Sequence, residues 1–159
     1  MKKYLFILSI LLFTTTLVNA QRKYSKEKEE QLERINAQKV AFFTKETGMT
    51  SETAQKFWPV YNEYSSKKDS LYHLRKEIQH QLDEKKATLT NQQKNESLDM
   101  IIRLKIESAE LEQRYHQKFK KILSIDQIIL LYEAEHEFRM RLFKQMKETR
   151  KPDEKKDND

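Results

Sequence analysis

The scarcity of glycine and proline is the feature that most constrains this sequence. Its 159 residues contain one glycine and two prolines, so few positions favour the tight turns that connect β-strands. Glu, Lys, Gln, Leu and Arg dominate instead, and all five are good helix formers. We therefore predict an all-α fold.

Apolar residues that recur at steps of three and four predict four amphipathic helices, which together form one helical domain over 21–151. Pro59 lies well inside the second helix and predicts a kink there. Gly48 is expected to end the first helix in a left-handed conformation. The polar residues 152–159 are expected to form a disordered tail. The helices are expected over 25–47, 51–86, 91–121 and from 125 to about 151.

Three of the expected helices begin with a capping signal. A Thr or Ser stands directly before each of them, where its hydroxyl oxygen can accept a backbone N–H. The sequences LTNQQ (89–93) and LSIDQ (123–127) also place a glutamine at the third helical position, which completes a capping box. Many unrelated helices begin in this way, so the motif alone predicts structure. Its residues are Thr50, Leu89, Thr90, Gln93, Leu123, Ser124 and Gln127.

The first twenty residues have the layout of a secretory signal peptide. Lys2 and Lys3 precede an apolar run, and small residues lead to a cleavage point near Ala20. The run is shorter than the roughly 20 apolar residues that cross a membrane, although an uncleaved anchor is the alternative. The chain has no cysteine, and therefore no thiol for a lipid anchor or a disulfide. We predict a periplasmic protein without a stable membrane anchor.

The charge pattern and the missing motifs exclude two classes of function. Positive and negative residues are interspersed, which is typical of solvated helices rather than of a basic surface that binds nucleic acid. The sequence has no glycine-rich phosphate loop, no nucleophile elbow and no H-E-x-x-H motif. We predict a protein that is not an enzyme and does not bind nucleic acid.

One group of side chains suggests a metal site as an alternative to the absence of any cofactor. His73, Glu77 and His80 are separated by four and three positions, so they share one face of a helix. Imidazole and carboxylate groups at this spacing can bind zinc or another divalent ion. A solvated polar face is the simpler explanation, because such spacings arise readily by chance on charged helices.

The two L-[TS]-x-x-Q helix starts, in a cysteine-free helical chain with a signal-like N-terminus, resemble the Spy/CpxP-like periplasmic family, which is named for its LTxxQ motifs. At the first start, Met49 and Thr53 stand where that motif has Leu and Gln. The stretch QKFWPVYNEY (55–64) resembles a variant common in Bacteroidetes, often labelled a sensor of an ECF-type sigma factor or a periplasmic heavy-metal sensor. The resemblance extends over about Leu32 to Met146.

The resemblance implies four helices in long bent hairpins, assembled as an antiparallel homodimer that forms a thin cradle. It also implies ATP-independent binding of unfolded or misfolded envelope proteins, with a signalling partner in some relatives. The densest aromatic group of the chain either packs the first two expected helices together or lines a client-binding surface. The client contacts that we predict from it are Phe42, Phe43, Trp58 and Tyr61.

Three hypotheses of function follow from the sequence. The first is a periplasmic chaperone-like or envelope-stress-response protein that binds misfolded proteins. The second is a metal-responsive periplasmic sensor linked to an ECF-type sigma factor. The third is a structural helical dimer without a client, whose apolar surface would be fully buried by self-association.

Overall fold

The computed structural model describes residues 26–149, and within this range it contains helices and turns but no strand. The all-α prediction is confirmed. The predicted signal peptide, residues 1–20, and the predicted tail, residues 152–159, lie outside the described residues.

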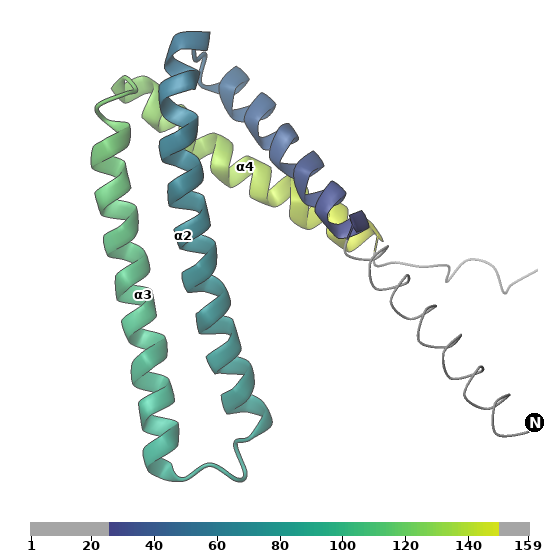
Figure 1. Cartoon of the computed structure of the whole chain (residues 1–159), viewed down its shortest axis with the longest axis vertical. Coiled ribbons are helices and arrows are strands. Elements are labelled where there is room, and N and C mark those ends of the chain that lie inside the picture. Colours follow the sequence, from purple (N-terminus) through teal and green to yellow (C-terminus); the bar gives the residue numbers. More distant parts are fainter. Residues whose placement is uncertain (1–25, 150–159) are drawn as a thin grey trace, which may run out of the picture. The chain divides into compact units, whose positions relative to one another are not determined.

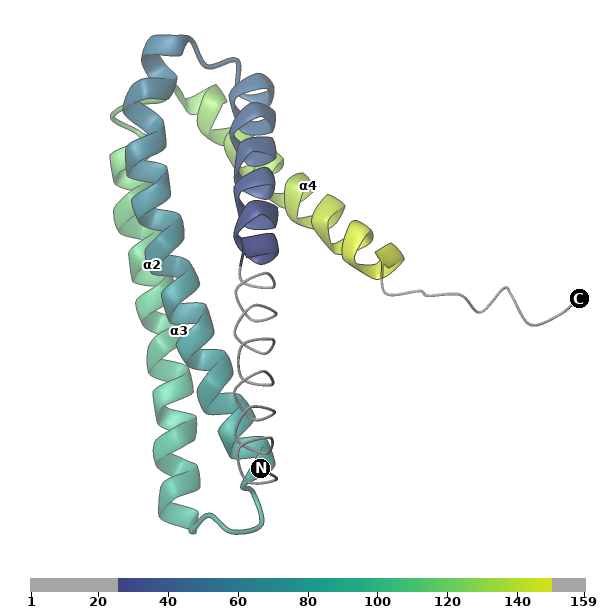
Figure 2. The same cartoon turned by 45° about the vertical axis from the view of Figure 1, so that its right-hand side comes forward.

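The chain divides into two compact units, Met1–Phe42 and Phe43–Asp159. The first described helix occupies residues 26–46 and therefore crosses the division. In the second unit, α2 and α3 run side by side in opposite directions, and α4 starts at the end of this hairpin where α2 begins (Figures 1 and 2). The bounds are Ser51–Glu84 for α2, Asn91–Phe119 for α3 and Ile125–Thr149 for α4.

α2 passes through Pro59 as one continuous helix of 34 residues. Proline lacks the N–H that would pair with the carbonyl four residues earlier, so one helical hydrogen bond is unmade. α2 nevertheless continues past the proline, and the kink expected there stays a prediction.

Capping boxes fix the starts of α3 and α4. The Thr90 hydroxyl accepts the Gln93 N–H at 3.2 Å, and the Gln93 side-chain oxygen accepts the Thr90 N–H at 2.9 Å. The same pair of bonds joins Ser124 and Gln127, at 3.2 and 3.1 Å. Each cap contributes about 1 kcal/mol. Both predicted capping boxes are confirmed.

The junction before α2 depends on Gly48, whose φ of 60° lies in the left-handed region. This conformation lets the Met49 N–H donate to the Thr44 carbonyl at 3.1 Å, and it leads to Thr50. The Thr50 hydroxyl caps α2 by accepting the Thr53 N–H at 3.2 Å. The predicted left-handed glycine and the predicted Thr50 cap are both confirmed.

Replacing Gly48 with alanine is expected to lower the free energy of unfolding by about 1 kcal/mol. No atom lies within 4 Å of the position that a Cβ would take, so the cost comes from the backbone conformation alone. Asparagine tolerates this conformation better, so Gly48→Asn should cost less. Urea unfolding followed by circular dichroism measures both, and equal stability of Gly48→Ala and the parent would contradict the assignment.

An aromatic cluster forms the core of the second unit. Rings of α2 meet rings of α3, with centroids 5.3 Å apart for Tyr64 and Tyr115 and 5.4 Å apart for Phe57 and Phe119. Phe138 of α4 reaches the same cluster through Phe43, 5.7 Å away. Ring pairs at these separations add stability beyond the area that they bury. Other buried apolar residues of this core are Met49, Tyr61, Leu123, Ile128, Leu131 and Ala134.

Polar side chains at the edge of this cluster connect α4 to the hairpin. The Tyr61 hydroxyl donates to the Glu135 carboxylate at 2.8 Å. Burial raises the pKa of Glu135 above its usual value, although this hydrogen bond acts in the opposite direction. The His116 Nδ1 of α3 lies 2.7 Å from the Tyr132 hydroxyl of α4, so α3 also has a polar contact with α4.

Candidate functional site

A groove runs along one side of the seam between α2 and α3. Its volume is about 520 Å³, and residues of both helices line it. We call it the wide groove. It is lined by Ser66, Lys67, Ser70, Leu71, Leu74, Glu107, Leu111, Arg114, Tyr115 and Lys118.

Small residues on α2 explain why the groove is hollow. Ser66 and Ser70 lie one helical turn apart, and neither has a side chain large enough to fill the space beside α3. Leu111 and Tyr115 of α3 are buried and supply an apolar floor. Leu74 extends this floor toward the tip of the hairpin and is 45% exposed. The groove therefore offers apolar surface in a concave setting.

Ion pairs surround this floor. The Lys67 Nζ lies 2.7 Å from one Glu63 carboxylate oxygen, and the Lys118 Nζ lies 3.5 Å from the other. The hydrogen bond from Lys67 lowers the pKa of Glu63 to about 2, so this carboxylate is ionised at neutral pH. The Lys118 ammonium also lies 4.2 Å from the centroid of the Tyr115 ring. The rim is charged, and its exposed ion pairs are weak because solvent screens them.

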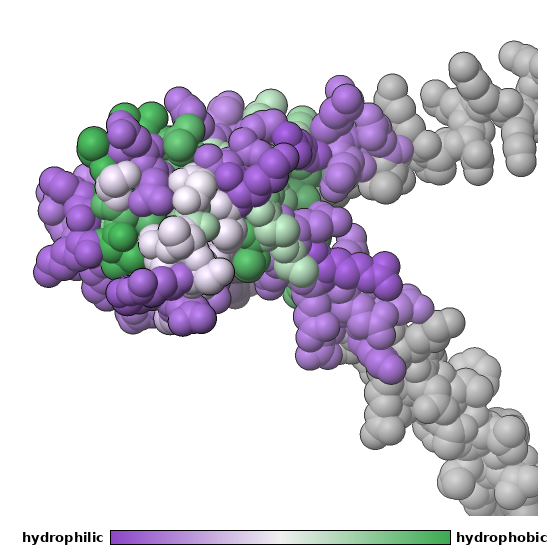
Figure 3. Space-filling view, turned by 90° about the horizontal axis from the view of Figure 1, so that it is seen from above, coloured by the Kyte–Doolittle hydropathy of each residue, from purple (hydrophilic) through white to green (hydrophobic). Residues whose placement is uncertain are grey.

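Large apolar side chains are also exposed outside the groove. Phe143 of α4 is 64% exposed. In the view onto the end of the hairpin where α2 begins, green apolar areas interrupt the purple hydrophilic surface (Figure 3). Exposed apolar side chains that lie together can contribute to an interaction surface. The exposed apolar residues of α3 and α4 include Leu98, Met100, Ile102, Ile106, Ile125, Ile129, Leu130 and Met140.

The predicted client contacts do not form an exposed surface. Phe43 and Tyr61 are 2% and 6% exposed, so they belong to the aromatic core and the prediction is corrected for these two rings. Trp58 is half-buried, and its Nε1 donates to the Thr44 hydroxyl at 3.1 Å. Phe42 is half-buried on the first helix. Phe43 and Tyr61 are buried because they lie on the apolar stripes that face the core of the second unit.

The structure does not gather the predicted metal ligands into a site. Glu77 accepts a hydrogen bond from Gln81 at 3.2 Å, and the His80 Nδ1 lies 3.3 Å from Glu84. His73 is exposed and its ring meets that of Tyr72. Within residues 26–149, no three His, Cys, Asp or Glu side chains are arranged to hold a metal ion.

The wide groove was not found from the sequence, although its floor residues were. Leu74, Leu111 and Tyr115 belong to the apolar stripes that predict the helices. The sequence does contain a signal for the groove, which is the pair Ser66 and Ser70. Two small residues one helical turn apart beside an apolar stripe leave a hollow.

Within the described part of the chain, none of the helices combines the length and the apolar character that crossing a membrane requires. Comparisons of the chain with protein-family models, with curated proteins and with solved structures found no match.

Proposed function

We propose that this protein is a periplasmic, ATP-independent binder of unfolded or misfolded envelope proteins, which acts as a chaperone or as the soluble arm of a stress response. The observation that carries the proposal is the wide groove, with its apolar floor and ionic rim. The exposed apolar side chains of α3 and α4 support it, because they offer further contacts to a client.

The groove is suited to loose and reversible binding. A client side chain that covers the floor at Leu74 and Leu111 gains about 25 cal/mol for each Å² of apolar surface buried. A few such contacts, reduced by the entropy of ordering the client, correspond to weak affinity. Lys67, Arg114 and Lys118 can reorient around different clients because long charged side chains keep their heads in water. Release would then need no nucleotide.

The test is suppression of aggregation of a chemically unfolded protein by the purified chain. We expect light scattering to fall as the chain is added, and Leu74→Ser to weaken this effect several-fold. Leu32→Ser is the matched control, because Leu32 is 53% exposed but lies on the first helix, outside the groove lining and not among the exposed apolar residues of α3 and α4. No suppression by the parent chain at several-fold molar excess would contradict the proposal.

Self-association is measured in the same samples. If light scattering reports a dimer, and an environment-sensitive hydrophobic dye does not bind to it, the apolar surface is covered by a second copy. That result would favour a structural dimer over a client-binding protein. Strong dye binding by the folded protein would support the groove as an open surface.

A further inference from the structure

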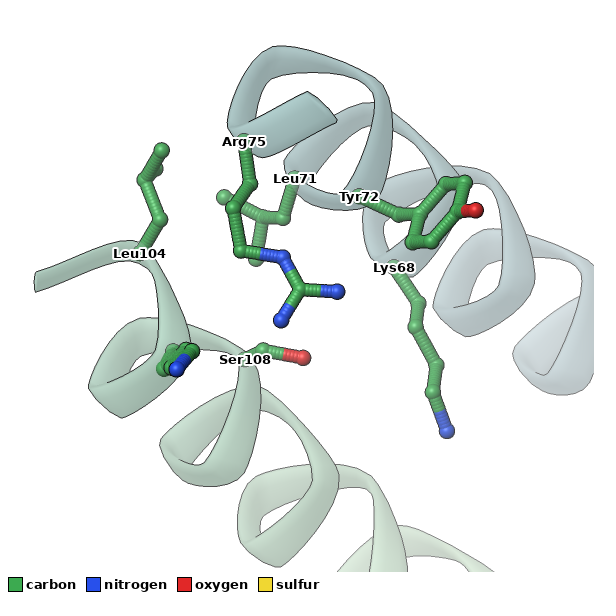
Figure 4. Close-up of a pocket in the computed structure, with 7 residues that line it drawn as sticks. Lys68, Leu71, Tyr72, Arg75, Leu104 and Ser108 are labelled. Atoms are coloured by element: carbon green, nitrogen blue, oxygen red, sulfur yellow. The ribbon is translucent and has the colours of Figure 1, made fainter. Parts of the chain in front are cut away.

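A second and smaller cavity lies on the other side of the α2–α3 seam. Its volume is about 190 Å³, and it shares a single lining residue, Leu71, with the wide groove. We call it the narrow cavity (Figure 4). Three of its lining residues are cationic and none is acidic. The lining residues are Lys68, Leu71, Tyr72, Arg75, Leu104, Lys105 and Ser108.

Two of the three cations, Arg75 and Lys105, differ from other cations beside this seam in their ion pairing. Lys67 and Arg114, which line the wide groove, each pair with a glutamate four residues earlier on the same helix. Arg75 and Lys105 form no ion pair with a carboxylate among residues 26–149. The sequence explains the difference, because no charged residue lies three or four positions from either one. These positions hold Leu71, Tyr72, Ile78 and Gln79 around Arg75, and Ile101, Ile102, Ser108 and Ala109 around Lys105.

Two polar side chains that line the narrow cavity are directed into it. The Arg75 guanidinium and the Ser108 hydroxyl point into the space between the two helices (Figure 4). The Arg75 guanidinium carbon lies 5.7 Å from the centroid of the Tyr72 ring, which restricts where the group can move. The Lys68 ammonium is held at one edge, where it donates to the Tyr64 hydroxyl at 2.7 Å and lies 3.4 Å from the Glu112 carboxylate.

We propose that the narrow cavity binds the oxyanion of a small anionic amphiphile, such as a carboxylate on a short apolar chain. Arg75 and Lys105 are like charges that line the same space, so they repel each other, and a bound anion would convert this repulsion into attraction. A planar guanidinium can hold a carboxylate through two parallel hydrogen bonds. The apolar chain would lie on Leu71 and on the buried Leu104. This site is independent of client binding in the wide groove.

Calorimetric titration of the purified protein tests the ligand class. We expect octanoate to bind, with 1-octanol at least tenfold weaker because it lacks the charge. Inorganic phosphate should also bind more weakly than octanoate, because it cannot cover the two leucines. No octanoate binding at millimolar concentration, or phosphate binding as tight as octanoate binding, would overturn the proposal.

Variants test the location. Arg75→Gln and Lys105→Gln are each expected to weaken octanoate binding about tenfold. Arg103→Gln is the control, because it removes the same charge from α3 outside the cavity lining and should leave the affinity unchanged. Equal losses in all three variants would mean general attraction to a basic protein. Amide chemical-shift changes that centre on the wide groove instead of on Leu104 and Ser108 would also overturn the assignment.

Discussion

Replacing Phe57 with alanine is expected to lower the free energy of unfolding by about 3–5 kcal/mol. The Phe57 side chain is fully buried, and its ring meets Trp58, Tyr61 and Phe119 at centroid distances of 5.3–5.4 Å. Alanine would remove these ring contacts and leave a cavity in the densest part of the core. Because small domains have a net stability of only about 5–15 kcal/mol, this variant should be close to unfolding at body temperature.

Urea unfolding followed by circular dichroism measures this loss. The matched control is Phe143→Ala, because Phe143 is 64% exposed on α4 and its removal leaves no buried cavity. The control should change the free energy of unfolding by no more than about 0.5 kcal/mol. Similar losses for the two variants would show that Phe57 is not the core residue that the structure describes.

Replacing Tyr61 with phenylalanine is expected to cost about 1–3 kcal/mol at neutral pH, because it leaves the half-buried Glu135 carboxylate without its 2.8 Å hydrogen bond. Burial raises the pKa of Glu135 in the folded state, while Tyr61, Lys68 and Arg139 favour the charged form and Glu112 opposes it. Without the Tyr61 hydroxyl the pKa should rise further.

The raised pKa of Glu135 determines how the stability of the fold depends on pH. A carboxyl group whose pKa is higher in the folded state stabilises the fold fully when it is protonated, below its unfolded pKa. That stability is lost as the pH rises through the folded pKa. The stability deficit of Tyr61→Phe should therefore grow from about pH 4 to pH 7.

Unfolding curves of Tyr61→Phe across this pH range provide the measurement. A second variant, Glu135→Gln, removes the titrating group but keeps a side-chain oxygen that can accept the Tyr61 hydroxyl. In the Glu135→Gln background, the effect of Tyr61→Phe should not change with pH. A deficit of the same size at every pH in the parent background would show that Glu135 is not the group responsible.

The sequence was sufficient for the fold class and for the first residue of α2, α3 and α4. Helix starts depend on contacts within four residues, such as that of Thr90 with Gln93, so their signal is local. The helix ends carried a weaker signal. α2 ends at Glu84 instead of the expected Lys86, and α3 ends at Phe119 instead of Lys121, where turn residues follow without a glycine.

The candidate site could not be predicted from the sequence, because it depends on which helix faces pack against each other. Phe43 is buried partly by Phe138, which lies 95 residues later in the chain, and periodicity does not reveal such a pairing. The wide groove likewise requires Ser66 and Ser70 to lie opposite Leu111 and Arg114. This register between helices is set by packing of the whole seam rather than by any local pattern.

Trp58 has a consequence for how this protein can be observed in solution. It is the single tryptophan of the chain, it is half-buried, and it contacts Phe43 and the Thr44 hydroxyl. All tryptophan fluorescence therefore originates where the start of α2 contacts the junction that precedes it, and Trp58 lines neither the wide groove nor the narrow cavity. A shift of its emission would report loosening of this junction, whereas a ligand that fills either hollow without disturbing the core would leave the spectrum unchanged.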